Sequence, residues 1–156
     1  MLFKDFIKNY EKELAHLYEN FVFNFFKNEL KDVKVYKPHI YWNLGSKQDC
    51  DKYLPIMKTD IVLENSHSQL IIDTKFYKNF LEKGKLNSAN LYQISSYIAN
   101  SDFKGEVEGM LLYASLGEDI NLEYNINGKK IYIKTLDLNQ DWQLIDSRLR
   151  EIADLI

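Results

Sequence analysis

Apolar residues recur at helical spacing along the first thirty residues of the chain. Between residues 5 and 30 they fall three and four positions apart, the period that places side chains on one stripe of a helix. The members of this stripe are Phe6, Tyr10, Leu14, Leu17, Phe21 and Phe25. Residues 21–26 are apolar nearly all round, so we expect this part of the helix to be deeply buried.

The rest of the pattern predicts short strands and two further helices. Apolar runs predict strands at 33–36, 59–63, 70–76 and 110–114, with extended structure around 40–44. Asn127 and Gly128 form a strong two-residue hairpin signal between the runs 122–126 and 131–133. Helical spacing recurs around Gln93 and again near the end, at Trp142, Ile145, Leu149 and Ile152. This order predicts an α/β protein with a mixed sheet flanked by helices.

Two of the predicted strands carry acids, which strands usually avoid. Because side chains alternate faces along a strand, Asp73 and Lys75 share one face and Ile72 lies on the other. If residues 65–68 form a four-residue loop, Asp60 on the preceding strand lies opposite Asp73. A loop one residue longer or shorter sends the two acids to opposite faces. We expect the acids to lie on the face away from the sheet's apolar layer.

Two facing carboxylates need something that offsets their repulsion. At about 5 Å and an effective dielectric constant near 20, they repel by roughly 3 kcal/mol. A hard divalent cation offsets this, since Mg²⁺ prefers carboxylate oxygens and keeps several waters. The alternative is an ordinary amphipathic hairpin whose acids face solvent, because exposed charges on strands are common.

The acidic hairpin also resembles a known catalytic segment. Residues 54–63 and 70–77 closely resemble that of the McrC family, nuclease subunits of modification-dependent restriction systems in the PD-(D/E)xK superfamily. The resemblance implies a PD-(D/E)xK restriction-endonuclease-like fold and a single nuclease domain over residues 1–156. Thr59 stands where the superfamily pattern has Pro. McrC proteins carry an amino-terminal region that engages a GTPase partner, and we expect that region to be absent here, in an excised domain or a naturally short relative.

The resemblance assigns roles to six residues: Glu19, Asp60, Asp73, Thr74, Lys75 and Gln93. It implies that Asp60 and Asp73 hold Mg²⁺, for which Mn²⁺ substitutes, with a backbone carbonyl from Thr74 and a helix-borne carboxylate from Glu19. A metal there supplies what phosphodiester cleavage needs, an activated water and neutralisation of phosphate charge. Lys75 can approach the attacking water or the developing anion; its alternative is a plain strand-face lysine.

Glu19 and Gln93 each have a structural alternative. Glu19 lies one turn before the aromatic stretch, where a carboxylate needs a partner or reaches water along its stem. Gln93 cannot act as a general base, but its amide can orient a water or hold a phosphate oxygen. It could equally be a surface glutamine on an amphipathic helix. The resemblance, in which a glutamine of this helix packs near the site, favours the functional interpretation of Gln93.

The net charge of the chain indicates how strongly it can bind DNA without a partner. A formal charge of −3 and a pI near 5.6 argue against strong stand-alone affinity for double-stranded DNA, because cationic side chains supply most nonspecific binding. Lys78, Lys83 and Lys85 are the best DNA-binding candidates, although such groups are more often a solvated face. The resemblance implies delivery by an AAA+ GTPase partner similar to McrB, and a homodimer is left open. No phosphate-binding glycine loop is present, so nucleotide hydrolysis would belong to that partner.

Composition is consistent with one intracellular domain. With 156 residues and 46% hydrophobic content, the chain can bury a core without covalent links. Cys50 has no partner for an internal disulfide, and the first residues lack the apolar run of a signal or membrane span, so the cytoplasm is expected. Two function classes follow: a Mg²⁺-dependent DNA endonuclease subunit, and a catalytically silent module that bridges DNA and a motor. The intact acid and lysine pattern favours the enzyme.

Overall fold

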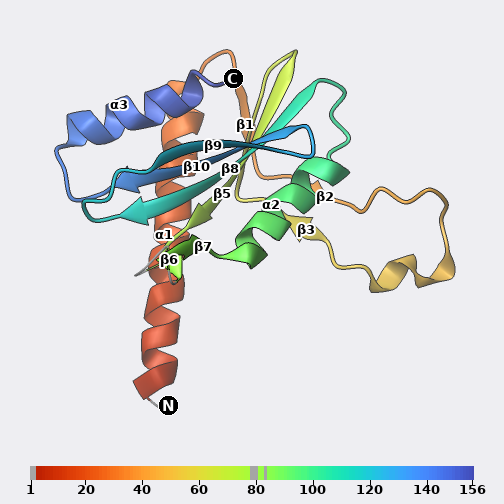
Figure 1. Cartoon of the computed structure of the whole chain (residues 1–156), viewed down its shortest axis with the longest axis horizontal. Helices are drawn as coiled ribbons and strands as arrows, with labels where there is room; N and C mark the ends of the chain where they lie inside the picture. Colours follow the sequence, from red (N-terminus) through yellow and green to blue (C-terminus); the bar gives the residue numbers. More distant parts are fainter. Residues whose placement is uncertain (1–2, 78–80, 83) are drawn as a thin grey trace.

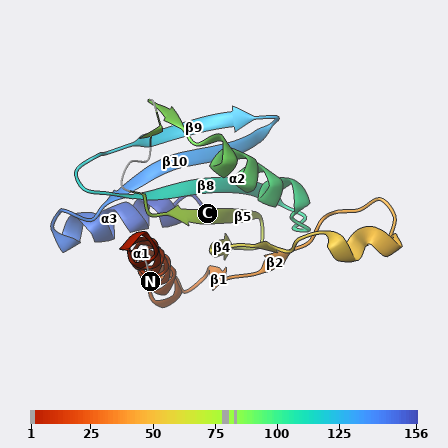
Figure 2. The same ribbon diagram turned by 90° about the horizontal axis from the view of Figure 1, so that it is seen from below.

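The computed structural model describes residues 3–77, 81–82 and 84–156, which form a six-stranded mixed sheet with helices on both faces (Figures 1 and 2). In chain order the elements are α1 (Phe3–Glu29), β1 (Lys34–Tyr36), β2 (His39–Ile40), the 3₁₀ helix η1 (Asp49–Tyr53), β3 (Met57–Lys58), β4 (Ile61–Glu64), β5 (Ser68–Lys75), β6 (Leu81–Glu82), β7 (Lys85–Leu86), α2 (Ser88–Asn100), β8 (Glu106–Ser115), β9 (Asn121–Ile126), β10 (Lys129–Asp137) and α3 (Trp142–Ala153).

The sheet has the strand order β1-β4-β5-β8-β10-β9. β1, β4 and β5 pair antiparallel, β5, β8 and β10 pair parallel, and β9 returns antiparallel to β10. A parallel pair needs a long crossover, and α2 supplies it between β5 and β8. The predicted α/β class with a mixed sheet flanked by helices is therefore confirmed.

Each face of the sheet carries its own apolar layer. α1 and α3 cover one face, where Val22 and Leu149 pack with Ile72. α2 covers the other face, where Ile94 packs with Ile71. The expectation that the acids lie away from the apolar layer is therefore wrong, because Ile71 points to the same side as Asp73 and is fully buried. Central strands of a parallel arrangement are covered on both faces, which the alternation within one strand does not reveal.

α2 lies close to the sheet because β8 has a glycine beneath it. A Cβ added at Gly109 would meet Ile98 Cδ1 at 2.6 Å and Ile94 Cγ1 at 2.7 Å. A larger residue there would push the helix outward. Gly109 thus sets the depth at which the side chains of α2 reach over the ends of β4 and β5.

Among the described side chains of α1, those that are buried lie in its second half. Its buried residues are Tyr18, Val22, Phe25 and Phe26, whereas Tyr10 and Leu17 of the predicted stripe are exposed. The first half of the helix extends beyond the sheet, as Figure 1 shows. The prediction of a long helix is confirmed, but its apolar stripe is not buried throughout because the sheet ends before the helix does.

Two smaller predictions have different outcomes. Asn127 and Gly128 have φ values of 53° and 75°, and they join β9 to β10 as the predicted two-residue hairpin. Of the extended structure expected around 40–44, only residues 39–40 form a strand, paired with β3. Residues 41–56 instead form an arm that carries η1 and points away from the sheet (Figure 2).

Candidate functional site

The register of the β4–β5 hairpin sets the positions of the two acids. Glu64 pairs with Gln69 and Ile61 with Ile72, so the predicted four-residue loop is confirmed. Continuing this register by one position places Asp60, which directly precedes β4, opposite Asp73. Asn65 fixes the loop, since its Oδ1 accepts hydrogen bonds from the backbone N–H groups of His67 and Ser68 at 2.8 and 2.9 Å.

The carboxylate of Asp60 is held by one residue of the neighbouring strand. Its Oδ2 accepts hydrogen bonds from the Thr74 backbone N–H at 2.8 Å and from the Thr74 hydroxyl at 2.9 Å. Burial raises the pKa of Asp60, the two bonds from Thr74 act against that rise, and the nearby charge of Glu19 adds to it. Thr59, where the superfamily pattern has Pro, anchors the preceding turn by donating from its hydroxyl to the Pro38 carbonyl at 2.7 Å.

Asp73 is a buried carboxylate that the fold leaves partly unsatisfied. Its side chain is 2% exposed, and the Lys75 Nζ lies 2.6 Å from its Oδ2. Lys75 is the ion-pair partner of this oxygen, no other described residue donates a hydrogen bond to it, and it is shielded from solvent. Burial raises the pKa of Asp73 to about 6 despite the charge of Lys75, and Asp60 and Glu19 contribute to the rise.

A chain of hydrogen bonds orients Lys75. Its Nζ donates to Gln93 Oε1 at 2.9 Å, and Gln93 Nε2 donates to the Tyr97 hydroxyl at 2.8 Å. The Tyr97 hydroxyl donates its one proton to the Lys58 carbonyl at 2.9 Å. Tyr97 therefore fixes the amide of Gln93 with its oxygen toward Lys75. Sequence reasoning did not include Tyr97, although its spacing of four from Gln93 on a helix was a usable signal.

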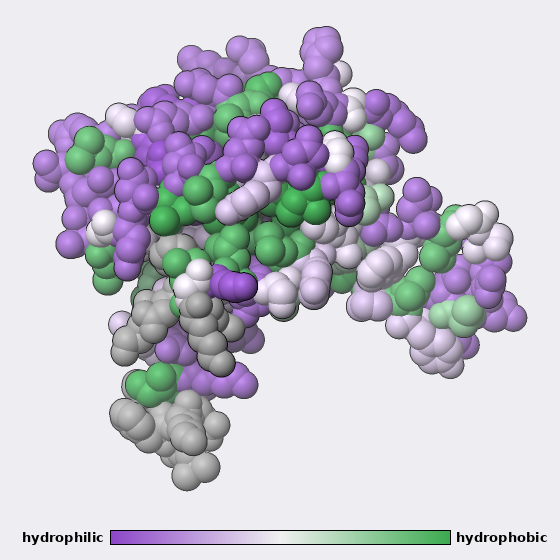
Figure 3. All heavy atoms as spheres, viewed as in Figure 1, coloured by the Kyte–Doolittle hydropathy of each residue, from purple (hydrophilic) through white to green (hydrophobic). Residues whose placement is uncertain are grey.

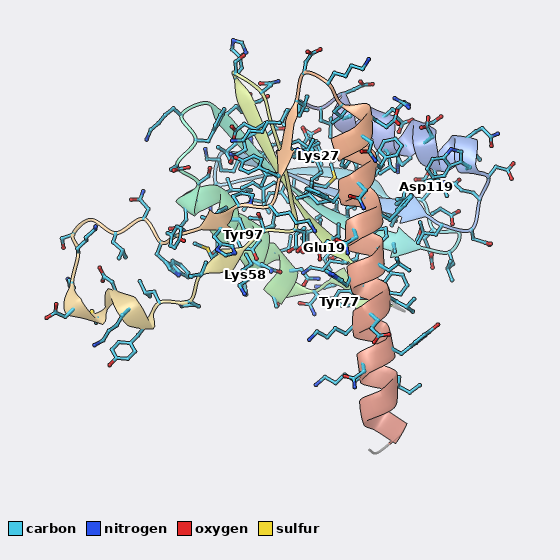
Figure 4. All side chains as sticks on the ribbon, turned by 180° about the vertical axis from the view of Figure 1, so that it is seen from behind. Glu19, Lys27, Lys58, Tyr77, Tyr97 and Asp119 are labelled. Atoms are coloured by element: carbon cyan, nitrogen blue, oxygen red, sulfur yellow. The ribbon has the colours of Figure 1, made fainter. Side chains whose placement is uncertain are left out.

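Glu19 reaches this end of the sheet from α1 but has its own partners. Its carboxylate forms a salt bridge with Lys37, and His16 Nδ1 lies 3.8 Å away. Figure 4 shows Glu19 on the side of α1 where Lys58 and Tyr97 also lie, at about the same height. Within the described ranges, no three His, Cys, Asp or Glu side chains lie close enough to form a metal site by themselves. Glu19 influences the pKa of both aspartates, and its expected role as a metal ligand stays a prediction.

The residues present at Asp60 and Asp73 fit a hard divalent cation. Both supply carboxylate oxygens, the ligand that Mg²⁺ prefers, and Mg²⁺ completes its shell with several waters, so it needs few protein ligands. A buried oxygen without a hydrogen bond, in Asp73, is the kind of group that a cation satisfies. The structure shows Thr74 orienting Asp60, and the carbonyl role expected for Thr74 stays a prediction.

The lysines expected to contact DNA lie mostly outside the described residues. Lys78 and Lys83 are not described, while Lys85 lies exposed on β7. Lys85 borders a groove of about 510 Å³ whose other walls, including Leu91 and Leu122, are mainly apolar. Contact between these lysines and DNA stays a prediction. In the described ranges no helix combines the length and apolar character needed to cross a membrane.

Comparison with known proteins shows which protein family the chain matches. The profile of the McrBC 5-methylcytosine restriction system component family matches residues 12–114, more than half of the chain. The type IV methyl-directed restriction enzyme EcoKMcrBC of Escherichia coli K12 is 34% identical over 159 residues, which cover 97% of this chain and 45% of that relative. The chain thus spans less than half the length of this relative.

A solved assembly shares the fold. A half-complex of Thermococcus gammatolerans McrB AAA+ hexamers with bound McrC contains a chain that matches with a TM-score of 0.64 at 14% identity, covering 91% of this chain and 33% of that one. The described sheet and helices are consistent with the predicted restriction-endonuclease-like fold. The residues brought together at the site all lie inside the matched range of the family profile: Glu19, Asp60, Asp73, Lys75, Gln93 and Tyr97.

Proposed function

Because the chain belongs to the McrBC 5-methylcytosine restriction system component family, as its resemblance to McrC indicated, we propose that it is the Mg²⁺-dependent DNA endonuclease subunit of an McrBC-like system. In this proposal the chain hydrolyses phosphodiester bonds at the end of the β4–β5 hairpin. An AAA+ GTPase partner similar to McrB recruits it to double-stranded DNA in the cytoplasm.

One observation supports the proposal most strongly: the buried carboxylate of Asp73, whose Oδ2 has the Lys75 ammonium as its one partner among the described residues. Buried polar atoms in native proteins are nearly always hydrogen-bonded, so a buried carboxylate that has one ion pair and no further donor calls for an explanation. Asp60 opposite Asp73 adds a second negative charge instead of a compensating group. A divalent cation between the two acids would compensate both negative charges, which Lys75 alone does not do.

The chain's own residues supply the remaining parts of the chemistry. A divalent cation held by Asp60 and Asp73 would polarise a phosphoryl oxygen and acidify a water molecule. The ammonium of Lys75 carries a positive charge next to this position and can stabilise the negative charge that develops on the phosphate. Gln93 holds Lys75 in place, and Thr74 holds Asp60, so neither side chain has to be ordered during the reaction.

Recruitment follows from the charge of the chain. A net charge of −3 leaves little affinity for the phosphate backbone, so a partner that binds DNA must bring the nuclease to its substrate. The solved relative contains McrB AAA+ hexamers bound to McrC, which supports a partner of the same type here. Lys85, with Lys78 and Lys83, is proposed to contact DNA once it has been delivered.

The test reconstitutes the chain with an McrB-like GTPase, GTP, Mg²⁺ and a methylated plasmid. Since GTP hydrolysis also needs Mg²⁺, the metal cannot simply be removed, and Asp73→Asn is compared with the wild type in the same mixture. We expect the wild type to cleave and Asp73→Asn to leave the plasmid intact, with equal GTP turnover. Glu108→Gln, which removes the charge of another buried acid, should cleave like the wild type.

Two outcomes would contradict the proposal. If the wild type supports GTP turnover but never cleaves, the chain is a silent binding module. If Asp73→Asn cleaves as fast as the wild type, the site lies elsewhere. The isolated chain should cleave slowly or not at all, and robust site-specific cleavage without GTP or partner would overturn the recruitment part.

A further inference from the structure

The first half of α1 carries a row of apolar side chains that the fold does not cover. Ile7, Tyr10 and Leu17 are 39, 54 and 66% exposed, and Leu14 between them is partly exposed. Figure 3 shows apolar side chains among hydrophilic ones on this projecting part of the helix. Single exposed apolar residues are ordinary, but four at regular positions on one element form a patch that calls for an explanation.

The spacing of these residues is that of a helix–helix seam. They are separated by three, four and three positions, which corresponds to positions a and d of a heptad repeat, with Ile7 and Leu14 at a and Tyr10 and Leu17 at d. The burial of α1 against its own sheet begins only at Tyr18. The seam therefore precedes the part of the helix that the sheet supports, and it is free to pack against another helix.

The charges beside the seam indicate what kind of helix fits. Glu11 and Glu13 occupy the two flanking positions, e and g, one on each side of the seam. Both are exposed, and neither makes an ion pair with another described residue. Lys8 and Lys12 lie on the opposite side of the helix. A partner helix would thus meet an apolar row bordered by negative charge.

We propose that this seam, formed by Ile7, Tyr10, Leu14 and Leu17, binds an amphipathic α-helix of a protein partner with apolar residues at its own a and d positions and Lys or Arg beside them. Lys or Arg is expected on the partner helix because these side chains would lie opposite Glu11 and Glu13. A second copy of α1 would bring acidic flanks against acidic flanks when the helices run antiparallel, which repels. Nucleic acid is excluded as the occupant because its phosphates would face Glu11 and Glu13. None of these residues belongs to the acid site, so the inference is independent of the proposed nuclease activity.

The test measures binding of labelled helical peptides to the full chain by fluorescence anisotropy. One 21-residue peptide has Leu at a and d and Lys at e and g, and a matched peptide differs only in having Glu at e and g. We expect the Lys peptide to bind at least about tenfold more tightly than the Glu peptide. Leu17→Glu should weaken binding of the Lys peptide at least about tenfold, because it places a charge in the seam. Leu116→Glu, at an equally exposed leucine elsewhere, should not.

A charge exchange separates the seam from general attraction to an acidic protein. The double variant Glu11→Lys with Glu13→Lys should reverse the preference, so that the Glu peptide binds more tightly. Glu106→Lys with Glu123→Lys makes the same change in net charge at exposed acids away from α1 and should leave the preference unchanged. Equal binding of both peptides, or full binding by Leu17→Glu, would overturn the proposal. Sedimentation that shows a dimer dissolved by Leu17→Glu would also overturn it, since the occupant would then be a second copy.

Discussion

Two buried carboxylates on neighbouring strands, Asp73 on β5 and Glu108 on β8, differ in the partners that surround them. Glu108 is 8% exposed, and each of its oxygens has a partner: Lys130 Nζ forms an ion pair with Oε1 at 3.1 Å, and the Tyr132 hydroxyl donates to Oε2 at 3.0 Å. Asp73 is more deeply buried and has an ion pair of the same kind, from Lys75 Nζ to Oδ2 at 2.6 Å, but no hydroxyl of a described residue donates to its carboxylate.

Glu108 has partners that compensate for the burial of its charge, whereas the burial of Asp73 is compensated only in part. Burying a charge costs free energy unless partners compensate for it, and β10 supplies those partners to Glu108. At Asp73 the nearest acid, Asp60, increases the cost, and burial raises the pKa to about 6. A residue that lowers the stability of the fold, while the rest of the structure compensates, is typical of functional sites.

The largest expected effect is on cleavage. Asp73→Asn, Asp60→Asn and Lys75→Ala should each reduce cleavage in the assembled system by on the order of 10²- to 10³-fold or more, because each removes charge from the reacting centre. The cleavage rate of Glu108→Gln should stay within about twofold of the wild type, since Glu108 contacts Lys130 and Tyr132 of β10 and not the reacting centre. A folded Glu108→Gln variant that loses as much activity as Asp73→Asn would remove the distinction.

The second prediction concerns the apolar layer between α1 and the sheet. Ile72, beside Asp73 in sequence, is fully buried on the opposite face. Ile72→Ala should lower the free energy of unfolding by about 2–5 kcal/mol through lost burial and a cavity. Urea unfolding of the variant and of the wild type measures this change in the free energy of unfolding. If the aspartate variants instead melt far below the wild type in EDTA while Ile72→Ala does not, the faces of β5 have been assigned the wrong way round.

The third prediction is a pH-dependent difference in stability between the two acids. Asp73 has a pKa near 6 when folded, above its ordinary value of 3.8, so the folded state binds its proton more tightly than the unfolded state. Its contribution to the free energy of unfolding therefore falls as pH rises from about 4 to about 6, by at most about 3 kcal/mol at 1.36 kcal/mol per pKa unit.

Asp73→Asn removes this loss, so in EDTA it should match the wild type near pH 4 and exceed it at pH 7.5. Glu108→Gln should instead be less stable than the wild type at pH 7.5, by about 1–3 kcal/mol, because it weakens satisfied buried bonds. Urea titrations of both variants and the wild type at the two pH values measure these differences. The prediction fails if Asp73→Asn differs from the wild type by the same amount at both.

The smallest expected effect is at Tyr97. Tyr97→Phe removes the hydroxyl that fixes the Gln93 amide, and cleavage should fall by about 2- to 10-fold, the equivalent of one hydrogen bond. Gln93→Ala should have at least the same effect, since it releases Lys75 directly. Tyr113→Phe is the matched control, because its hydroxyl accepts a hydrogen bond from Asn90 at 3.1 Å, whereas that of Tyr97 accepts from Gln93. Equal losses in both tyrosine variants would indicate a general packing effect.

The sequence predicts the geometry of the acidic hairpin because that geometry is local. The period of two along a strand and the length of one loop place Asp60 opposite Asp73, and the structure has this register. The salt bridge between Glu19 and Lys37 depends on how α1 crosses the sheet, which no local pattern encodes.

The same holds for burial of the acid-bearing face. It depends on α2 crossing from β5 to β8 and packing at Gly109, which joins residues far apart in the chain. The exposed half of α1 shows the converse case, since an apolar stripe predicts a buried helix face but does not say which molecule covers it.

Calorimetric titration of Mn²⁺ or Mg²⁺ tests the central claim most directly, because it asks whether the unsatisfied acid binds a cation. Wild type, Asp73→Ala and Glu108→Gln are titrated under the same conditions. We predict that the wild type and Glu108→Gln bind the ion alike, while Asp73→Ala loses the binding. Identical binding in the wild type and Asp73→Ala would contradict the account.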